Sequence, residues 1–278
     1  MIWPHVTKKN PCPICGKGDW CSVGDRAVLC QRVQSSKPHV KGGWFHSLDS
    51  KVKAEFKEKP KPAPKILTGI AAMIERWAGE TSINDFEAQA ELLGVSPESL
   101  ASLNMVYATE HRAWAFPMCD GYGEMIGIRL RSNYGYKWAV KGSRSGIFMP
   151  ENLGTTVPTL AYLVEGPTST AAALTMGLPA IGRPQNNAGG DLILTALRRL
   201  KINKVVIVAD NDDKPPSEIH PQGLRPGLNG AVKLAKELRG IRSIIWTPPT
   251  KDIRDFLKAG GTRQAIESEI KNLVWIKS

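Results

Sequence analysis

The sequence predicts an α/β protein that consists of a small cysteine-rich module, a linker, a mixed α+β region and a parallel sheet flanked by helices. Three observations support this prediction. Four of the five cysteines fall within residues 12–30, a lysine- and proline-rich stretch covers residues 51–65, and apolar strands alternate with helices from residue 160 onward. Strands that alternate with helices are typical of a parallel sheet covered on both faces.

The cysteines predict a metal-binding module that resembles a zinc ribbon. In Cys12-Pro-Ile-Cys15-Gly16, two thiolates separated by two residues can bind one tetrahedral ion, and the glycine permits a tight turn. A module of this size has too small a core to be stable alone, so a metal ion would replace missing burial. Disulfides are the alternative, but they are rare in the cytoplasm.

The second half of the module offers more than one possible set of ligands for this ion. Eight residues separate the third cysteine from the fourth, so they do not form a second close pair. His39 or His46 therefore remains an alternative ligand. We expect one structural zinc ion bound by Cys12, Cys15, Cys21 and Cys30.

The segment KVKAEFKEKPKPAPK contains six lysines and three prolines at alternate positions. It has little to bury and therefore predicts a flexible basic linker. The predicted domains are a zinc-binding module at 1–50, the linker at 51–66, a helical and basic strand-rich region at 67–157, and the parallel sheet with C-terminal helices at 158–278.

The positive charge is concentrated in the N-terminal part of the 278-residue chain. Residues 1–66 hold 13 Lys and Arg against 5 Asp and Glu, whereas the remainder holds 24 against 21. This balance favours a polyanionic partner, of which nucleic acid is the commonest, although a lysine-rich surface that only keeps the protein soluble is the simpler alternative. No apolar run is long enough for a membrane span and no secretory signal is present, so we expect a cytoplasmic protein.

Helices are predicted after the linker because apolar residues recur at helical spacing. The expected helices cover 66–80 and 84–94, with Asn84 as the N-cap of the second, and a Ser-Pro-Glu start follows within 95–104. From residue 107 the period changes to two, which predicts strands. These strands are expected at 112–118, 124–131, 135–142 and 145–150.

Basic residues accumulate over residues 125–150, a region that contains no acid. Alternation places Arg129 and Arg131 on one face of a strand, where they could hold template phosphates or a triphosphate. A solvated sheet face is the alternative. Tyr134, Tyr136 and Trp138 could stack on bases or belong to the core. The candidate nucleic-acid or nucleotide contacts are Arg129, Arg131, Lys137, Lys141 and Arg144.

Acidic residues follow three strands of the predicted parallel sheet, although a polar turn is the simpler explanation of any one of them. The strand LAYLVEG ends at Glu165, KVVIVADNDD ends at Asp210, Asp212 and Asp213, and Asp252 and Asp255 follow the last strand. Ligands gather at the carboxyl ends of parallel strands. If the first two strands are neighbours, this all-oxygen set suits Mg²⁺ or Mn²⁺.

This arrangement resembles the TOPRIM domain of primases, topoisomerases and certain nucleases. A strand that ends in Glu165-Gly166 precedes a strand that ends in Asp210-Asn211-Asp212, and the resemblance covers about residues 158–260. With the zinc module, the linker and the basic strands, the chain is similar to bacterial and phage DNA primases. The compressed cysteine spacing is closer to phage or mobile-element versions, and the proline-rich insertion at 214–226 departs from the family.

The resemblance implies a DNA-directed RNA primase that uses single-stranded DNA and ribonucleoside triphosphates. It assigns catalysis or metal positioning to Glu165 and metal binding to Asp210 and Asp212, with Asp213, Asp252 and Asp255 as secondary candidates. The sequence lacks a GxxxxGK[ST] phosphate loop, so we expect a separate replicative helicase as a partner. The alternatives are a TOPRIM-type nuclease and a non-catalytic zinc-containing DNA-binding protein; a topoisomerase would need a further large domain.

Overall fold

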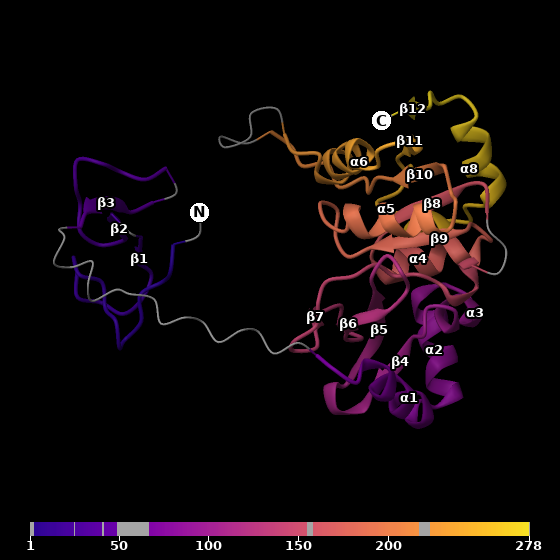
Figure 1. Ribbon diagram of the computed structural model, residues 1–278, viewed down its shortest axis with the longest axis horizontal. Helices are drawn as coiled ribbons and strands as arrows, with labels where there is room; N and C mark the ends of the chain where they lie inside the picture. Colours follow the sequence, from indigo (N-terminus) through magenta and orange to yellow (C-terminus); the bar gives the residue numbers. More distant parts are fainter. Residues whose placement is uncertain are drawn as a thin grey trace. The chain divides into compact units, whose positions relative to one another are not determined.

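Figure 1 shows a computed structural model of the protein, which describes residues 3–24, 26–40, 42–48, 67–154, 158–216 and 223–277. The chain divides into two compact units, Met1–Pro64 and Lys65–Ser278. The linker predicted at 51–66 lies outside the described residues, as does the middle of the insertion predicted at 214–226.

The first unit contains a three-stranded antiparallel sheet in the order β1-β2-β3. Its core is small: in the described part of the unit, Val6, Val23 and Val28 pack with the buried cysteine side chains, and the partly buried Ile14 and Leu48 lie against them. So little apolar burial would leave the unit marginally stable without a further cross-link such as a metal ion. The strands are β1 (Ser22–Val23), β2 (Ala27–Cys30) and β3 (Trp44–Ser47).

Three helices open the second unit, and serine side chains determine where the second and third begin. The Ser82 hydroxyl accepts a hydrogen bond from the backbone N–H of Asp85, so Ser82 is the N-cap of the second helix. The prediction that Asn84 caps this helix was wrong, because Asn84 already lies in its first turn. Ser96 caps the third helix in the same way. The helices are α1 (Ile70–Glu80), α2 (Ile83–Leu93) and α3 (Pro97–Ala101).

A four-stranded antiparallel sheet follows, in the order β4-β5-β6-β7. One face packs on α1 through Ile74 and the fully buried Trp77. The other face packs on α2, α3 and the later helix α4 (Gly166–Thr175) through Trp114 and Phe116. The elements are β4 (Val106–Ala108), η2 (Thr109–His111), β5 (Ala113–Cys119), β6 (Met125–Arg131) and β7 (Lys137–Ala139).

The strand predicted at 145–150 is not a strand of this sheet. Ile147 pairs with Cys119 of β5, whereas Phe148 pairs with Gly182 of β9 (Ala180–Arg183) in the second sheet. The alternation of apolar residues is real, but the backbone divides its hydrogen bonds between two sheets. This segment therefore joins the two halves of the unit and leads into the short helix η3 (Glu151–Gly154).

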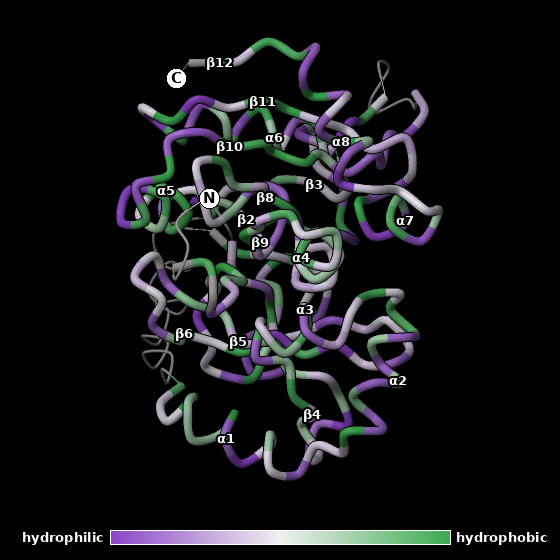
Figure 2. Tube along the Cα trace, turned by 90° about the vertical axis from the view of Figure 1, so that its right-hand side faces the viewer, coloured by the Kyte–Doolittle hydropathy of each residue, from purple (hydrophilic) through white to green (hydrophobic). Residues whose placement is uncertain are grey.

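The second sheet has the order β12-β11-β10-β8-β9, in which four strands are parallel and β12 is antiparallel at the edge. Leu163 and Ile207 pack against α5 and α6, whereas Tyr162 and Val206 pack against the helices of the other face. Figure 2 shows the hydrophobic residues along β8 and β10. The elements are β8 (Ala161–Glu165), α5 (Gly190–Arg199), β10 (Lys204–Val208), α6 (Pro226–Glu237), β11 (Arg242–Trp246), α7 (Ile253–Lys258), α8 (Arg263–Ile270) and β12 (Ile276–Lys277).

The predicted fold class is confirmed by this architecture. A small cysteine module, a mixed α+β region and a parallel sheet flanked by helices occur in the expected order. The antiparallel strand β12 is an addition that the sequence reading did not include. No helix within the described ranges combines the length and apolar character needed to cross a membrane.

Candidate active site and metal centre

The acidic residues predicted at two strand ends meet at one edge of the parallel sheet. Strands β8 and β10 are hydrogen-bonded neighbours, with Ala161 opposite Val205 and Leu163 opposite Ile207. Their carboxyl ends therefore lie side by side, which places Glu165 near the start of the Asp210 segment. Gly166 has a φ of 76°, a conformation that favours glycine, and it turns the chain directly into α4.

Asp210 carries the strongest electrostatic perturbation among these acids. Burial, together with the charges of Glu165, Asp252 and Asp212, raises the pKa of Asp210 to about 7, although Arg183 opposes the shift. The Oδ1 atom is buried and has no hydrogen-bond partner. A buried carboxylate oxygen without a partner is unfavourable and is suited to accept a cation.

Glu165 is also shifted toward its neutral form. Burial raises the pKa of Glu165, Arg183 and Lys137 lower it, and Asp212 raises it further. The close carboxylates thus destabilise one another when they are charged, which is the behaviour of acids that share a site. A divalent cation between them would remove this repulsion.

The remaining acids differ in their hydrogen bonds and ion pairs. Asp212 Oδ1 accepts a hydrogen bond of 2.8 Å from the backbone N–H of Gly227, and Asp252 caps α7 while its charge still acts on Asp210. Asp213 instead forms an ion pair of 2.8 Å with Arg225, and Asp255 lies 3.9 Å from Arg254. Electrostatic interactions therefore link Asp210 and Asp212 to Glu165, and Asp252 to Asp210, while Asp213 and Asp255 have their own basic partners.

Two of the five predicted basic residues face this acidic edge. Arg131 and Lys137 are register partners on β6 and β7, so their side chains share one face of the hairpin. Burial and Arg131 lower the pKa of Lys137, whereas Glu165 and Asp210 raise it. Burial and Arg254 lower the pKa of Arg131, and Asp252 opposes them. The hairpin thus carries cations beside the carboxylates of the other sheet.

The other three basic residues lie farther along the hairpin. Arg129 shares the face of Arg131 and pairs with Ala139, and its buried Nε has no hydrogen-bond partner. Lys141 and Arg144 follow β7 in a loop, and the Arg144 backbone N–H donates to Ile126 O at 2.9 Å. Among the described ion pairs, none joins these three residues to an acid.

Sequence reasoning missed two arginines at this edge. Arg183 ends β9 directly opposite Glu165, is 1% exposed, and has buried Nε and Nη2 atoms without hydrogen-bond partners. Arg254 follows Asp252 and has a buried Nε without a partner. The sequence shows Arg183 at the end of the apolar strand AIGR, but its place beside Glu165 depends on the order of the strands in the sheet.

A chain of hydrogen bonds connects Arg183 to Asp212 through two loops. Arg183 Nη1 donates to Asn186 O at 2.7 Å, and Asn186 Nδ2 donates to Pro226 O at 3.1 Å. The next residue, Gly227, donates its backbone N–H to Asp212. A Cβ atom on Gly227 would lie 2.1 Å from Asp210 O, so only glycine permits this close approach of α6.

The four cysteines of the first unit form a compact group. Their sulfur atoms all lie within 4.8 Å of one another, with Cys15 and Cys21 Sγ atoms 3.7 Å apart and Cys21 and Cys30 Sγ atoms 4.0 Å apart. Tetrahedral zinc with Zn–S bonds of about 2.3 Å would separate the sulfurs by about 3.8 Å, so the geometry fits zinc. Backbone N–H groups of Gln31 and Val33 donate to the sulfurs of Cys21 and Cys30.

The two alternative histidine ligands lie outside this sulfur group. His46 Nε2 donates to Val33 O at 2.9 Å, and the His39 ring packs edge-on against Phe45. Although burial opposes it, hydrogen bonds from Lys17 and the neighbouring thiols lower the pKa of Cys15 to about 7. Burial instead raises the pKa of Cys12 and raises that of Cys21 to about 12, so a bound metal ion would be needed to keep these two as thiolates, the form that binds metal.

The acidic edge differs from the cysteine group because it is not a preformed cage. Within the described residues, the cysteines are the group close enough to hold an ion as they stand. The acidic set nevertheless fits Mg²⁺ or Mn²⁺ by its chemistry, since its ligands are all oxygen and Asp210 Oδ1 is unpartnered.

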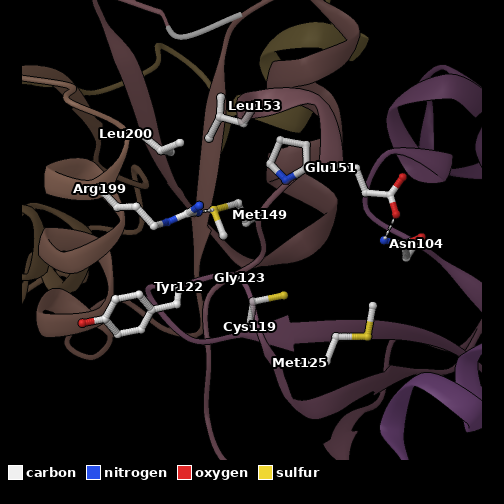
Figure 3. Close-up of a pocket in the computed structure, with 11 residues that line it drawn as sticks. Asn104, Cys119, Tyr122, Gly123, Met125, Met149, Glu151, Leu153, Arg199 and Leu200 are labelled. Carbon is white, nitrogen blue, oxygen red and sulfur yellow. Dashed lines mark hydrogen bonds between the residues drawn. The ribbon is translucent and has the colours of Figure 1, made fainter. Parts of the chain in front are cut away.

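A cavity of about 250 Å³ in the second unit is lined by none of its acidic-edge residues (Figure 3). Arg199, at the end of α5, reaches Met149 Sδ at 3.8 Å, and Asn104 Nδ2 donates to Glu151 at 3.0 Å. None of the predicted catalytic or nucleotide-contacting residues lines it. The lining residues are Asn104, Cys119, Tyr122, Gly123, Met125, Met149, Pro150, Glu151, Leu153, Arg199 and Leu200.

Comparison with known proteins supports this architecture through structure alone. No family model and no curated protein sequence matches the chain. The Escherichia coli primase catalytic core is similar at 15% identity and a TM-score of 0.56, over 73% of this chain and 79% of that one.

Two further solved structures include a zinc-binding part or cover nearly the whole chain. The zinc-binding and RNA polymerase domains of Aquifex aeolicus primase match at 16% identity and a TM-score of 0.56, over 73% of this chain and 60% of theirs. The primase fragment of the bacteriophage T7 primase-helicase protein matches at 13% identity and a TM-score of 0.51, over 97% of this chain and 100% of that one. The protein therefore has the fold of bacterial and phage primases.

Proposed function

We propose that this protein is a primase that synthesises short RNA primers on single-stranded DNA. The observation that carries the proposal is the acidic edge of the parallel sheet, where Glu165, Asp210 and Asp212 face Arg131 and Lys137 of the neighbouring hairpin. Carboxylates that can hold divalent cations, next to basic side chains that can hold phosphates, are the two requirements of nucleotidyl transfer. The primase fold of the chain supports this assignment.

In this proposal the acidic edge binds Mg²⁺ or Mn²⁺ through Glu165, Asp210 and Asp212, with Asp252 as a fourth ligand. The ions, when bound, would neutralise the triphosphate and stabilise charge as the phosphodiester bond forms. Arg131 and Lys137 would bind phosphate oxygens and orient the incoming nucleotide. We leave Asp213 and Asp255 out of this ligand set, because each lies beside a basic residue of its own.

The proposed division of the chain follows from the same reading. Residues 1–50 form a zinc-binding module, 51–66 a linker, 67–157 the basic strand-rich part of the polymerase domain, and 158–278 the TOPRIM part. Cys12, Cys15, Cys21 and Cys30 would bind one zinc ion, whose role is to stabilise a module with a small core.

Single-stranded DNA is the proposed template. One structure similar to this chain is a DnaG primase catalytic domain bound to single-stranded DNA, at 14% identity and a TM-score of 0.56. Arg129, Lys141 and Arg144 extend the basic hairpin away from the acidic edge and are proposed to contact the template backbone. The T7 fragment belongs to a primase-helicase protein, and we propose a helicase as a partner here.

The test is incubation of the protein with single-stranded DNA, labelled ribonucleotides and Mg²⁺ or Mn²⁺. Short labelled RNA that appears only with template and metal supports the proposal. Shortened DNA without RNA would instead identify a TOPRIM-type nuclease, and DNA binding without either product would identify a non-catalytic binding protein. The Glu165→Gln variant is the control for a contaminating polymerase, because it should lose the activity while it stays folded.

A further inference from the structure

Trp20 in the cysteine module is held in an exposed and strained position. Its side chain is 75% exposed, and its backbone φ is 63°. A bulky residue rarely adopts this left-handed conformation, and strained residues of this kind cluster at functional sites. Core packing does not explain an exposed Trp side chain whose backbone adopts an unfavourable conformation.

Arg32 stacks on one face of this indole. The guanidinium carbon lies 5.5 Å from the centre of the Trp20 ring. The guanidinium is fixed by Asp19, because Nη2 lies 3.0 Å from Asp19 Oδ1 and Nη1 donates to Asp19 O at 3.1 Å. With one ring face against Arg32 and most of the side chain exposed, the other face is open to a planar ligand.

The metal-binding cysteines position both members of the pair. Trp20 immediately precedes Cys21, and Arg32 follows Cys30 by two residues. Cys21 N donates to Asp19 O at 2.8 Å, and Arg32 Nη1 lies 3.9 Å from Cys21 Sγ. The platform, defined here as Trp20 with Arg32, is therefore built on the same short segments that surround the proposed zinc ion.

The charge around the platform indicates the class of ligand. In the described part of the first unit, Asp19 is the sole acid, and it already pairs with Arg32. Six basic residues of the same ranges are exposed, so the surface attracts a polyanion. These residues are Lys8, Lys9, Lys17, Arg26, Arg32 and Lys37.

We propose that Trp20 and Arg32 form a stacking platform for an unpaired base of single-stranded DNA, whose phosphates the surrounding lysines and arginines hold. An open aromatic face within a basic surface is how proteins bind single strands with little sequence preference, because every base has a π-face. Duplex DNA does not fit this role, since its bases are already stacked. The inference gives a residue-level contact to the template named under the proposed function and rests on it only for that biological setting.

The test measures binding of the zinc-loaded full chain to a short labelled single strand by fluorescence anisotropy, without nucleotides. Loss of one base stack should weaken the affinity of Trp20→Ala by about 5- to 100-fold. Trp20→Phe should retain most of the affinity, because it keeps an aromatic face. Val40→Ala is the matched control, since Val40 is a 99% exposed apolar residue of the same unit, and it should bind as the unchanged protein does.

A second ligand separates stacking from charge. An oligonucleotide of equal length that lacks its bases should bind Trp20→Ala and the unchanged protein equally well. Wild-type affinity of Trp20→Ala for the normal strand would overturn the proposal, as would an equal loss with the baseless strand or with duplex. Zinc content and circular dichroism of each variant establish that it is folded.

RNA synthesis, measured in parallel, distinguishes this inference from the proposed function. If the protein makes no RNA but Trp20→Ala still loses DNA affinity in a base-dependent way, the stacking platform is supported and the primase function is refuted. Conversely, RNA synthesis with unchanged DNA binding in Trp20→Ala supports the primase and overturns the platform.

Discussion

Arg183 and Glu165 are register partners at the ends of neighbouring parallel strands, so a buried arginine shares the acidic edge with the Glu165 carboxylate. Burial raises the pKa of Glu165, and the positive charge of Arg183 lowers it. Burial lowers the pKa of Arg183, and the negative charge of Glu165 raises it. Neither charge is stable alone in this environment. The arginine thus acts as a fixed counter-charge for the acids when no metal ion is bound.

Arg183→Met should destabilise the second unit by about 2–4 kcal/mol, because it leaves buried carboxylates without a counter-charge and removes the first hydrogen bond of the chain to Asp212. Arg183→Lys should recover part of this loss, since it restores the charge but not the fork of donors. Urea unfolding measures both. Arg198→Met, on the exposed side of α5, is the matched control and should change stability little; an equal effect there would show that Arg183 has no special role.

Glu165→Gln should reduce RNA synthesis by about 10²-fold or more, because it removes a charge that the proposed metal ions need. Its stability should change little, because relief of the repulsion between carboxylates offsets the loss of one counter-charge of Arg183, which keeps Asp210 as the other. A primer synthesis assay and thermal unfolding measure the two effects. Glu124→Gln, an exposed acid in the β5–β6 turn, should stay active, and full activity in Glu165→Gln would refute the assignment.

The stability of the metal-free acidic edge should fall as pH rises. Burial and Glu165 raise the pKa of Asp210 from 3.8 to about 7, so between these pH values the folded protein holds a proton that the unfolded chain has released. The folded state is therefore favoured at low pH, and the ionised carboxylate is a penalty above pH 7 that corresponds to at most about 4 kcal/mol. Added Mg²⁺ or Mn²⁺ should remove this penalty.

Asp210→Asn isolates this effect. At about pH 8 without added Mg²⁺ or Mn²⁺ the variant should be more stable than the unchanged protein, and the difference should vanish below about pH 4, where Asp210 is protonated in both states. Urea unfolding over the pH range tests this. Asp213→Asn should show no comparable pH dependence, because Asp213 forms an exposed ion pair with Arg225. A stability difference independent of pH would contradict the prediction.

Removal of zinc should unfold the first unit and leave the second intact, because only the first depends on the ion for its core. Elemental analysis should find about one zinc ion per chain, as four thiolates bind one ion. Cys30→Ser should lose zinc, whereas Cys119→Ser, a buried cysteine of β5, should keep it. Retention of full zinc content in Cys30→Ser would rule out the four-cysteine site.

The sequence was sufficient for the parts of the fold that depend on local pattern. Continuous apolar runs between helical segments located β8 and β10, and the rule that ligands gather at the carboxyl ends of parallel strands predicted that Glu165 and Asp210 would meet if these strands were neighbours. The sequence pattern did not predict strand pairing that depends on residues far apart in the chain. Residues 145–150 alternate like a strand, but Ile147 bonds to one sheet and Phe148 to the other.

The interaction partners of individual charged residues could likewise not be predicted from the sequence. Asp212 and Asp213 are adjacent, yet one accepts the Gly227 N–H and the other pairs with Arg225, which depends on where α6 begins. Arg183 belongs to the site only because β9 lies next to β8 in register. An arginine at a strand end carries no local signal of that neighbour, so this part of the site required the sheet order.

Lys137→Gln should raise the KM for nucleotides by roughly tenfold with a smaller effect on kcat, because it removes a phosphate contact that forms on binding. Lys137 interacts electrostatically with Glu165 and Asp210, whereas Lys141 lies four residues later in the loop after β7 and should not touch the nucleotide. Lys141→Gln is therefore the matched control: it should leave the KM for nucleotides unchanged and only weaken binding of the template. Steady-state synthesis with varied nucleotide and fixed template measures both parameters. Equal KM changes in the two variants would mean that charge alone, and not the position beside the acidic edge, determines nucleotide binding.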